Sequence, residues 1–245
     1  MNDGSPISGV VTRMRQRLDD LPELLARRRY FLGTYMRTTQ AVGTAIDRAG
    51  FEDPAWVEEW DVSFAEFYLR AHDADLDGDR VPRPWRLAFD ASADLPALAH
   101  VLLGINAHVN YDLPQALLDV ISDDDFKDRF LMDRRRRDHE RIDGVLAGRV
   151  AAEDGELAAT GPRSLLDHVL TPLNRLASQR FLREARQKVW HNTVELQKAR
   201  VQGCYETRLG ELEVLSAAKV ADLLRPGQVL LRLAVTGFGV TLPPP

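Results

Sequence analysis

The sequence predicts an all-α fold, a single compact helical domain with a short extended C-terminal arm. Hydrophobic residues recur with the period of an α-helix along almost the whole chain, and proline, glycine and short polar residues separate the helical stretches. The chain has 245 residues, of which 44% are hydrophobic and 28% charged, enough for one sizeable core. We therefore expect one domain over residues 1–245, loose over about residues 1–10 and extended over about residues 226–245.

Proline marks two helix starts in the N-terminal half of the chain. Proline is accepted in the first turn of a helix because its missing N–H would have no partner there. Residues 20–22 thus predict a helix that ends near Gly50, and Asp53-Pro54 predicts the next one, which carries aromatic residues as far as Leu69. Residues 72–84 are interrupted by Asp, Gly and Pro, and we interpret them as a loop.

The C-terminal half begins with the most apolar stretch, residues 95–120, in which Pro114 predicts a kink or break. Ser122 and the three aspartates after it predict a helix cap, because side-chain oxygens and negative charge both stabilise a helix N-terminus. The helix that follows is expected to end near residue 146, and residues 148–162 are expected to form a loop. The remaining predicted elements are helices over 164–176, 178–201 and 206–224 and a hairpin or extended arm over 229–242.

Charge and composition exclude several classes of protein. The 32 Lys and Arg against 37 Asp and Glu give a net charge of −5, which argues against nucleic-acid binding, because phosphates are bound through clustered cations. No apolar stretch is long enough to span a membrane, and residues 1–14 lack the apolar core of a signal peptide. A single cysteine, Cys204, excludes an internal disulfide. We expect a cytoplasmic protein, and the sequence leaves its oligomeric state open.

The predicted helix over residues 95–118 carries an unusual number of polar side chains for so apolar a stretch. A buried polar group without a partner costs about 1–3 kcal/mol, so a helix that served stability alone would rarely carry them. We interpret them as one wall of a pocket, with Gly104 leaving room for a neighbouring side chain or a ligand. The alternative is that the polar groups pair with one another or hold loops in place. They are His100, Asn106, His108, Asn110, Tyr111 and Asp112.

The stretch GINAHVNYDLPQAL, residues 104–117, resembles the signature of an actinobacterial family of unknown function. Members of that family carry a similar Asn-Ala-His-(Ile/Val)-Asn-x-Asp-Leu run in a central helix. The segments YFLGTYMRTTQAVGTAI and FEDPAWVEEWDVSFAEFYLRA agree with the family more loosely. The resemblance implies a compact all-helical domain and supplies no established chemistry.

Two helical His-x-x-x-carboxylate pairs, His108/Asp112 and His191/Glu195, indicate a divalent metal such as zinc, iron or manganese. One turn of helix separates the members of each pair, so both members can bind one ion, and His100 is a further candidate ligand. A third pair, His139/Asp143, lies in a highly charged stretch and is predicted to be solvated. The two pairs resemble those of the zinc-dependent phospholipase C and P1-type nuclease family, although this chain lacks that family's N-terminal Trp ligand.

Three functions stay open at this stage, all of them with a small molecule as the ligand. The first is metal-assisted hydrolysis of an ester or phosphoester, with a metal-bound water as the nucleophile. The second is cofactor-free acid–base catalysis by a cyclase or isomerase of secondary metabolism. In it His108 transfers the proton, Asp112 orients it, and Asn106, Asn110 and Tyr111 position the substrate. The third is a non-catalytic module that binds an apolar ligand or a partner. The acidic run of residues 73–79 raises the separate possibility of a calcium site.

Overall fold

The computed structural model describes residues 4–160, 165–225, 237 and 239–244 of the chain. Within these residues the structure contains helices and no strand, so the predicted all-α fold is confirmed. None of the described helices combines the length and the apolar character that crossing a membrane requires. The helices are α1 (Pro6–Asp19), α2 (Arg28–Asp47), α3 (Pro54–Leu76), α4 (Arg83–Phe89), α5 (Ala97–Ala107), α6 (Leu113–Val120), α7 (Arg129–Thr160), α8 (Leu165–Val201) and α9 (Tyr205–Leu224).

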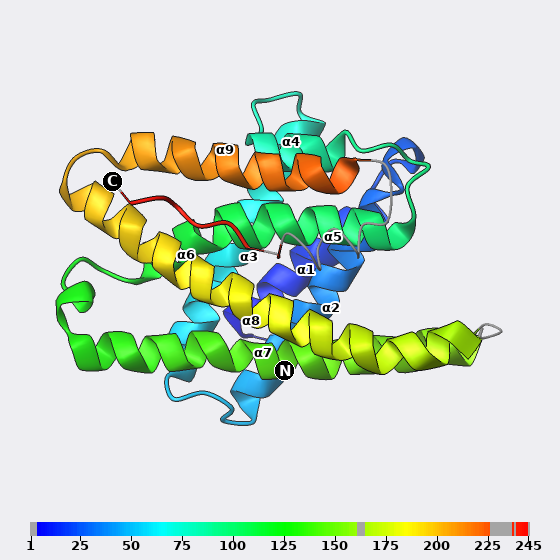
Figure 1. Cartoon of the computed structure of the whole chain (residues 1–245), viewed down its shortest axis with the longest axis horizontal. Coiled ribbons are helices and arrows are strands. Elements are labelled where there is room, and N and C mark those ends of the chain that lie inside the picture. Colours follow the sequence, from blue (N-terminus) through cyan, green and yellow to red (C-terminus); the bar gives the residue numbers. More distant parts are fainter. Residues whose placement is uncertain (1–3, 161–164, 226–236, 238, 245) are drawn as a thin grey trace.

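The helices α5 and α6 run through the middle of the molecule, between α9 and α4 on one side and α7 on the other (Figure 1). Helix α6 packs against α3 and α8, and α5 packs against α2, α4 and α9. The long helices α7 and α8 are antiparallel neighbours, and α8 then crosses obliquely over the central helices (Figure 1). The central polar helix of the sequence is therefore covered from several directions.

The core is dominated by aromatic side chains from α2, α3 and α4. Burying these rings removes a large apolar area from water, and tilted and edge-to-face contacts between them add to the packing energy. The largest fully buried side chains include Trp60, Tyr68 and Trp85, each about 1% exposed. Asp53 caps α3 by accepting the Trp56 backbone N–H at 3.2 Å, so the predicted start of this helix at Asp53-Pro54 is confirmed.

Helix boundaries differ from the prediction in several places. Helix α2 begins at Arg28 and not at residues 20–22, α7 begins at Arg129 and not after Ser122, and the single helix α8 replaces the two predicted over 164–176 and 178–201.

The ends of three segments differ as well. Residues 6–10, predicted to be loose, belong to a helix, because α1 begins at Pro6 and buries Ile7 and Val10. Helix α3 continues to Leu76, inside the predicted loop, because Asp73 and Asp75 on its last turn pair with arginines of α1 and α2. Helix α7 continues to Thr160, through the predicted loop over residues 148–162.

The predicted extended arm lies partly outside the described residues, which include only Gly237 and residues 239–244 of it. These described residues are neither helix nor strand, and they lie along α8. Lys188 donates to the Gly239 carbonyl, and Asn192 both donates to the Val240 carbonyl at 3.0 Å and accepts the Leu242 N–H at 2.9 Å. The end of the chain is thus held by side chains of α8.

Candidate functional site

The candidate site is centred on His108, which lies where the central helix changes its geometry. Residues His108–Asp112 form a π-helical turn between α5 and α6. Pro114 explains the change, because proline has no N–H for the carbonyl four residues earlier and its ring would collide with that carbonyl. The widened turn removes the collision, and such turns occur frequently at functional sites. The predicted break at Pro114 is therefore present, in the residues that precede the proline.

His108 and Asp112 form a buried pair, as their spacing predicted. The Nδ1 atom of His108 is 2.8 Å from Oδ2 of Asp112, and each side chain is only 2% exposed. The same carboxylate oxygen accepts the indole N–H of Trp85 from α4 at 2.7 Å. An indole N–H can only donate, so Oδ2 is the acceptor for Trp85, and one proton is shared between this oxygen and Nδ1 of His108.

Burial favours the neutral form of both side chains of the pair. It lowers the pKa of His108, against the opposing effect of Asp112, and it raises the pKa of Asp112, against the opposing effect of His108. The imidazole is therefore neutral at pH 7. In the tautomer that has its N–H on Nδ1, facing an ionised Asp112, it carries a free electron pair on Nε2.

Aromatic rings surround the His108 imidazole, and we call this set the aromatic box. The ring of Phe64 stacks on it with the centroids 3.6 Å apart, and the ring of Tyr35 meets it edge-on at 4.5 Å. Phe31, Tyr68 and Trp85 complete the box at 5.7–6.0 Å. Nε2 of His108 is buried in the box without a hydrogen-bond partner among the described residues.

A second polar group in the aromatic box is the Tyr35 hydroxyl. Burial raises the pKa of Tyr35, and the negative charges of Asp61 and Asp112 act in the same direction. A weak hydrogen-bond interaction with Thr39 opposes this rise of the pKa, although neither hydroxyl has a partner in full hydrogen-bond geometry among the described residues. The box thus places an unpaired acceptor on His108 beside a phenol that keeps its proton.

The other predicted site residues of the central helix point elsewhere. Asn106 and Asn110 bond to each other at 3.3 Å, and Asn110 also accepts the Val240 N–H at 3.3 Å. Tyr111 packs in a separate apolar cluster with residues that include Leu196 of α8. These three side chains therefore contact the C-terminal segment, α8 and one another. Such contacts match the alternative interpretation, in which the polar groups hold neighbouring segments in place.

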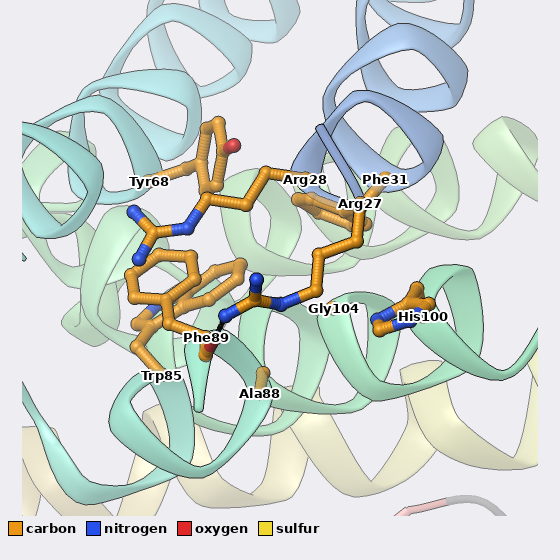
Figure 2. Close-up of a pocket in the computed structure, with 9 residues that line it drawn as sticks. All are labelled: Arg27, Arg28, Phe31, Tyr68, Trp85, Ala88, Phe89, His100 and Gly104. Carbon is orange, nitrogen blue, oxygen red and sulfur yellow. Dashed lines mark hydrogen bonds between the residues drawn. The ribbon is translucent and has the colours of Figure 1, made fainter. Parts of the chain in front are cut away.

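Gly104 and His100 line a small hollow, which Trp85 lines as well (Figure 2). The space left by Gly104 is filled by a neighbouring side chain, because a Cβ atom there would be 2.3 Å from Cδ2 of Phe31. His100 is 6% exposed, and Tyr30 stacks on it at 5.9 Å. Burial lowers the pKa of His100, and the nearby Arg27 adds to this effect.

Of the five proposed metal ligands, only His108 and Asp112 come together. His191 is exposed, with Nε2 3.4 Å from the Leu242 carbonyl, and Glu195 forms ion pairs with Lys198 at 2.7 Å and Arg208 at 3.6 Å. In the described part of the chain, no three His, Cys, Asp or Glu side chains form a group able to hold a metal. Asp73 and Asp75 are likewise engaged with arginines, so they do not form an open calcium loop.

A second buried polar cluster, which the sequence did not reveal, lies between α3, α7 and α8. His139 is fully buried, so its predicted solvation was wrong, and neither of its ring nitrogens has a hydrogen-bond partner among the described residues. Arg186 pairs with Asp143 at 2.6 Å and donates to the His139 carbonyl at 3.3 Å. Burial raises the pKa of Asp61 to about 7 and lowers that of His139 well below its ordinary value. No clear signal of this cluster is present in the sequence, because four consecutive arginines, residues 134–137, precede His139.

Comparison with known proteins shows the family. The model of the family of unknown function DUF5995 matches residues 7–226, most of the chain. The chain belongs to DUF5995. No curated protein and no solved structure matches it. The DUF5995 match includes the π-helical turn, the aromatic box and both histidines of the central helix, and it carries no activity with it, so the chemistry rests on the geometry above.

Proposed function

We propose that this protein is an enzyme that moves a proton on a small apolar molecule without a cofactor, with His108 as the general base and acid. The observation that carries the proposal is the unpaired Nε2 atom of a buried histidine whose other nitrogen is held by a carboxylate. A buried polar atom without a partner is uncommon and often marks a catalytic role or the place of a missing ligand.

The arrangement around His108 fits this chemistry. Nε2 takes a proton from a carbon next to a carbonyl group, and the same proton returns to that carbon or to another one. Asp112 keeps the N–H on Nδ1 and stabilises the imidazolium while it exists. The unpaired hydroxyl of Tyr35 is a donor for the oxyanion that forms on the substrate. The aromatic box favours an apolar substrate.

Access to His108 requires side-chain movement, because the imidazole is 2% exposed. Phe31, Tyr68 and Trp85 contact the imidazole and also line the hollow shown in Figure 2. The hollow therefore borders the wall of the box. Rotation of one of these rings would expose Nε2 to it.

Metal-assisted hydrolysis has less support from the same residues. His108 and Asp112 are one turn apart and would supply two ligands, but Oδ2 of Asp112 already accepts from His108 and Trp85. His191 and Glu195 have partners of their own, and His100 lies at the hollow. This set of donor atoms does not fit a catalytic metal.

The experiment is hydrogen exchange at carbon. The protein is incubated in D₂O with a panel of small apolar ketones and unsaturated ketones, and loss of the proton signals next to the carbonyl is followed by NMR. We expect exchange of at least one compound above the rate in buffer. The His108→Gln variant should lose this excess, by roughly 100-fold or more, because general acid–base catalysis contributes that much.

Matched variants separate catalysis from folding. Asp112→Asn should slow exchange by disturbing the tautomer of His108, and Tyr35→Phe should slow it by removing the oxyanion donor. His191→Gln changes an exposed histidine outside the box and should leave exchange unchanged. Melting temperatures are measured for all four variants. A folded His108→Gln variant that exchanges as fast as the wild type, or a panel without any exchange, would refute the proposal and favour a binding module.

A further inference from the structure

We propose that the hollow between α2, α4 and α5 is a binding site for the carboxylate end of an apolar acid. It lies between two arginines at the start of α2 and the aromatic residues of α3 and α4 (Figure 2). Its lining residues are Arg27, Arg28, Phe31, Tyr68, Trp85, Ala88, Phe89, His100 and Gly104. Catalysis at His108 is not needed for such binding, so the inference stands apart from the proposed function.

Buried N–H groups of Arg28 supply the first argument. Arg28 is only 8% exposed, and its guanidinium lies 4.3 Å from the centroid of the Phe89 ring. Nη2 of Arg28 pairs with Asp75, but Nε and Nη1 have no hydrogen-bond partner among the described residues. Burying a guanidinium with unpaired N–H groups is unfavourable in free energy. An anion that accepts hydrogen bonds from these groups would lower this free-energy cost.

Arg27 extends the donor set of Arg28, and His100 lines the same hollow. Arg27 donates through Nη1 to the Leu24 carbonyl at 3.1 Å and through Nη2 to the Phe89 carbonyl at 2.9 Å, which fixes the guanidinium at the hollow (Figure 2). Its Nε is buried and unpaired, and so is Nε2 of His100. Two positive charges, only one of them balanced by Asp75, therefore face a hollow with unpaired nitrogens on three side chains.

The size of the hollow favours a carboxylate. Its volume is about 20 Å³, which is room for about one water molecule or for one oxygen of a carboxylate whose body lies outside. The unpaired nitrogens of the two arginines would each donate a single ionic hydrogen bond to a carboxylate oxygen, and a phosphate, with four oxygens, needs more room and more donors.

The surroundings of the hollow favour an acid with an apolar body. The walls are the rings of Phe31, Trp85 and Phe89, and the residues next to its arginines include two exposed apolar side chains. Leu24, whose carbonyl holds Arg27, is 86% exposed, and Tyr30, which stacks on His100, is 46% exposed. A chain attached to the carboxylate would leave the hollow over these side chains.

The test uses octanoate, below its micelle concentration, with the full-length protein. Binding is measured by calorimetry and by the indole N–H signal of Trp85 in ¹H–¹⁵N NMR spectra, assigned with Trp85→Phe. Octanol, which has the same chain without the charge, and inorganic phosphate are the comparison probes. We expect saturable binding of octanoate, a shift of the Trp85 signal, and binding of octanol and phosphate weaker by about tenfold or more.

A matched pair of variants tests the arginines. Arg27→Gln should weaken octanoate binding by about tenfold, because an ionic hydrogen bond is lost. Arg29→Gln removes the same charge from an exposed neighbour that is not part of the hollow and should not change the affinity. Equal effects of the two variants, equal binding of octanol and octanoate, or tighter binding of phosphate would each overturn the carboxylate assignment.

The two proposals fail separately. His108→Gln should keep its octanoate affinity even where it loses proton exchange, because the imidazole is not part of the hollow. Loss of octanoate binding in Arg27→Gln with normal exchange in the same variant would show a binding site independent of the reaction. If the wild-type protein catalyses exchange but does not bind octanoate, only the proposed carboxylate site is refuted.

Discussion

The imidazole of His108 lies flat on the ring of Phe64, with the centroids 3.6 Å apart and the planes inclined by only 6°. Phe64 belongs to α3, and His108 to the π-helical turn of the central helix. The stack fixes one face of the imidazole, and Asp112 fixes one edge. Together the two contacts determine where the unpaired Nε2 atom points.

Replacing Phe64 with leucine should destabilise the protein by about 1–2 kcal/mol, because the stack is lost and the smaller side chain leaves part of the core unfilled. The measurement is urea unfolding followed by circular dichroism. Phe130→Leu is the control, since Phe130 is 87% exposed and its replacement should change stability by no more than about 0.5 kcal/mol. Equal losses in the two variants would contradict the structural role of the stack.

Replacing Gly104 with alanine should destabilise the protein by about 1–3 kcal/mol, although alanine is the better helix former. The new Cβ would be 2.3 Å from Cδ2 and 3.0 Å from Cβ of Phe31, a core residue that cannot withdraw without disturbing Tyr68 and Trp85. Thermal or urea unfolding measures the change.

Gly210 provides the matched control for that variant. It lies inside α9, and a Cβ atom there would meet nothing within 4 Å. Gly210→Ala should therefore stabilise the protein by up to about 1 kcal/mol, the helix-propensity difference alone. If Gly104→Ala were stabilising as well, the close contact between Gly104 and Phe31 would be disproved.

Local signals in the sequence predicted the start of one helix and one side-chain contact. The geometry of the central helix depends on long-range packing. Asp53-Pro54 predicted a helix start, and the spacing of His108 and Asp112 predicted their contact, because both features depend on a few neighbouring residues. Pro114 predicted a break, but the form of the break, a π-helical turn, depends on how the surrounding helices pack. Local composition therefore predicted the helical architecture and only part of its geometry.

The side chains around His108 could not be predicted in the same way. Phe64 and Trp85 come from two other helices, and no spacing in the sequence indicates that they meet the imidazole. Asn110 looked like a site residue, but it holds Val240, a residue 130 positions away. His139 looked solvated because the arginines beside it are charged, although its own side of α7 faces Trp60 and Trp190.

Zinc should not stabilise the protein through the predicted ligands. A metal that binds the folded state raises the melting temperature, and His108 and His191 do not lie in one group of ligands. We expect any rise caused by excess zinc to be the same in the wild type, His108→Gln and His191→Gln. A rise in the wild type that disappears in both variants would show that the two histidines share a metal after all.

Asp61 should make the protein less stable as the pH rises from about 4 to 7. Burial raises its pKa to about 7 in the folded state, whereas in the unfolded chain the carboxyl has its ordinary pKa of 3.8. Between these values the folded state binds more protons, so the free energy of unfolding falls with rising pH, by at most about 1.4 kcal/mol per pH unit. Above about pH 7 the carboxyl is ionised in both states and this dependence ends.

Asp61→Asn should remove this dependence, because an amide does not ionise. The buried histidines titrate in the opposite direction, since burial lowers the pKa values of His108 and His139, but they do so in both proteins. The measurement is therefore the difference in unfolding free energy between Asp61→Asn and the wild type in urea at pH 4.5, 6 and 8. We expect this difference to move in favour of the variant as the pH rises, and not to move for Asp124→Asn, whose side chain is 89% exposed. A difference that is constant with pH would mean that Asp61 is already ionised in the folded protein, stabilised by Arg186.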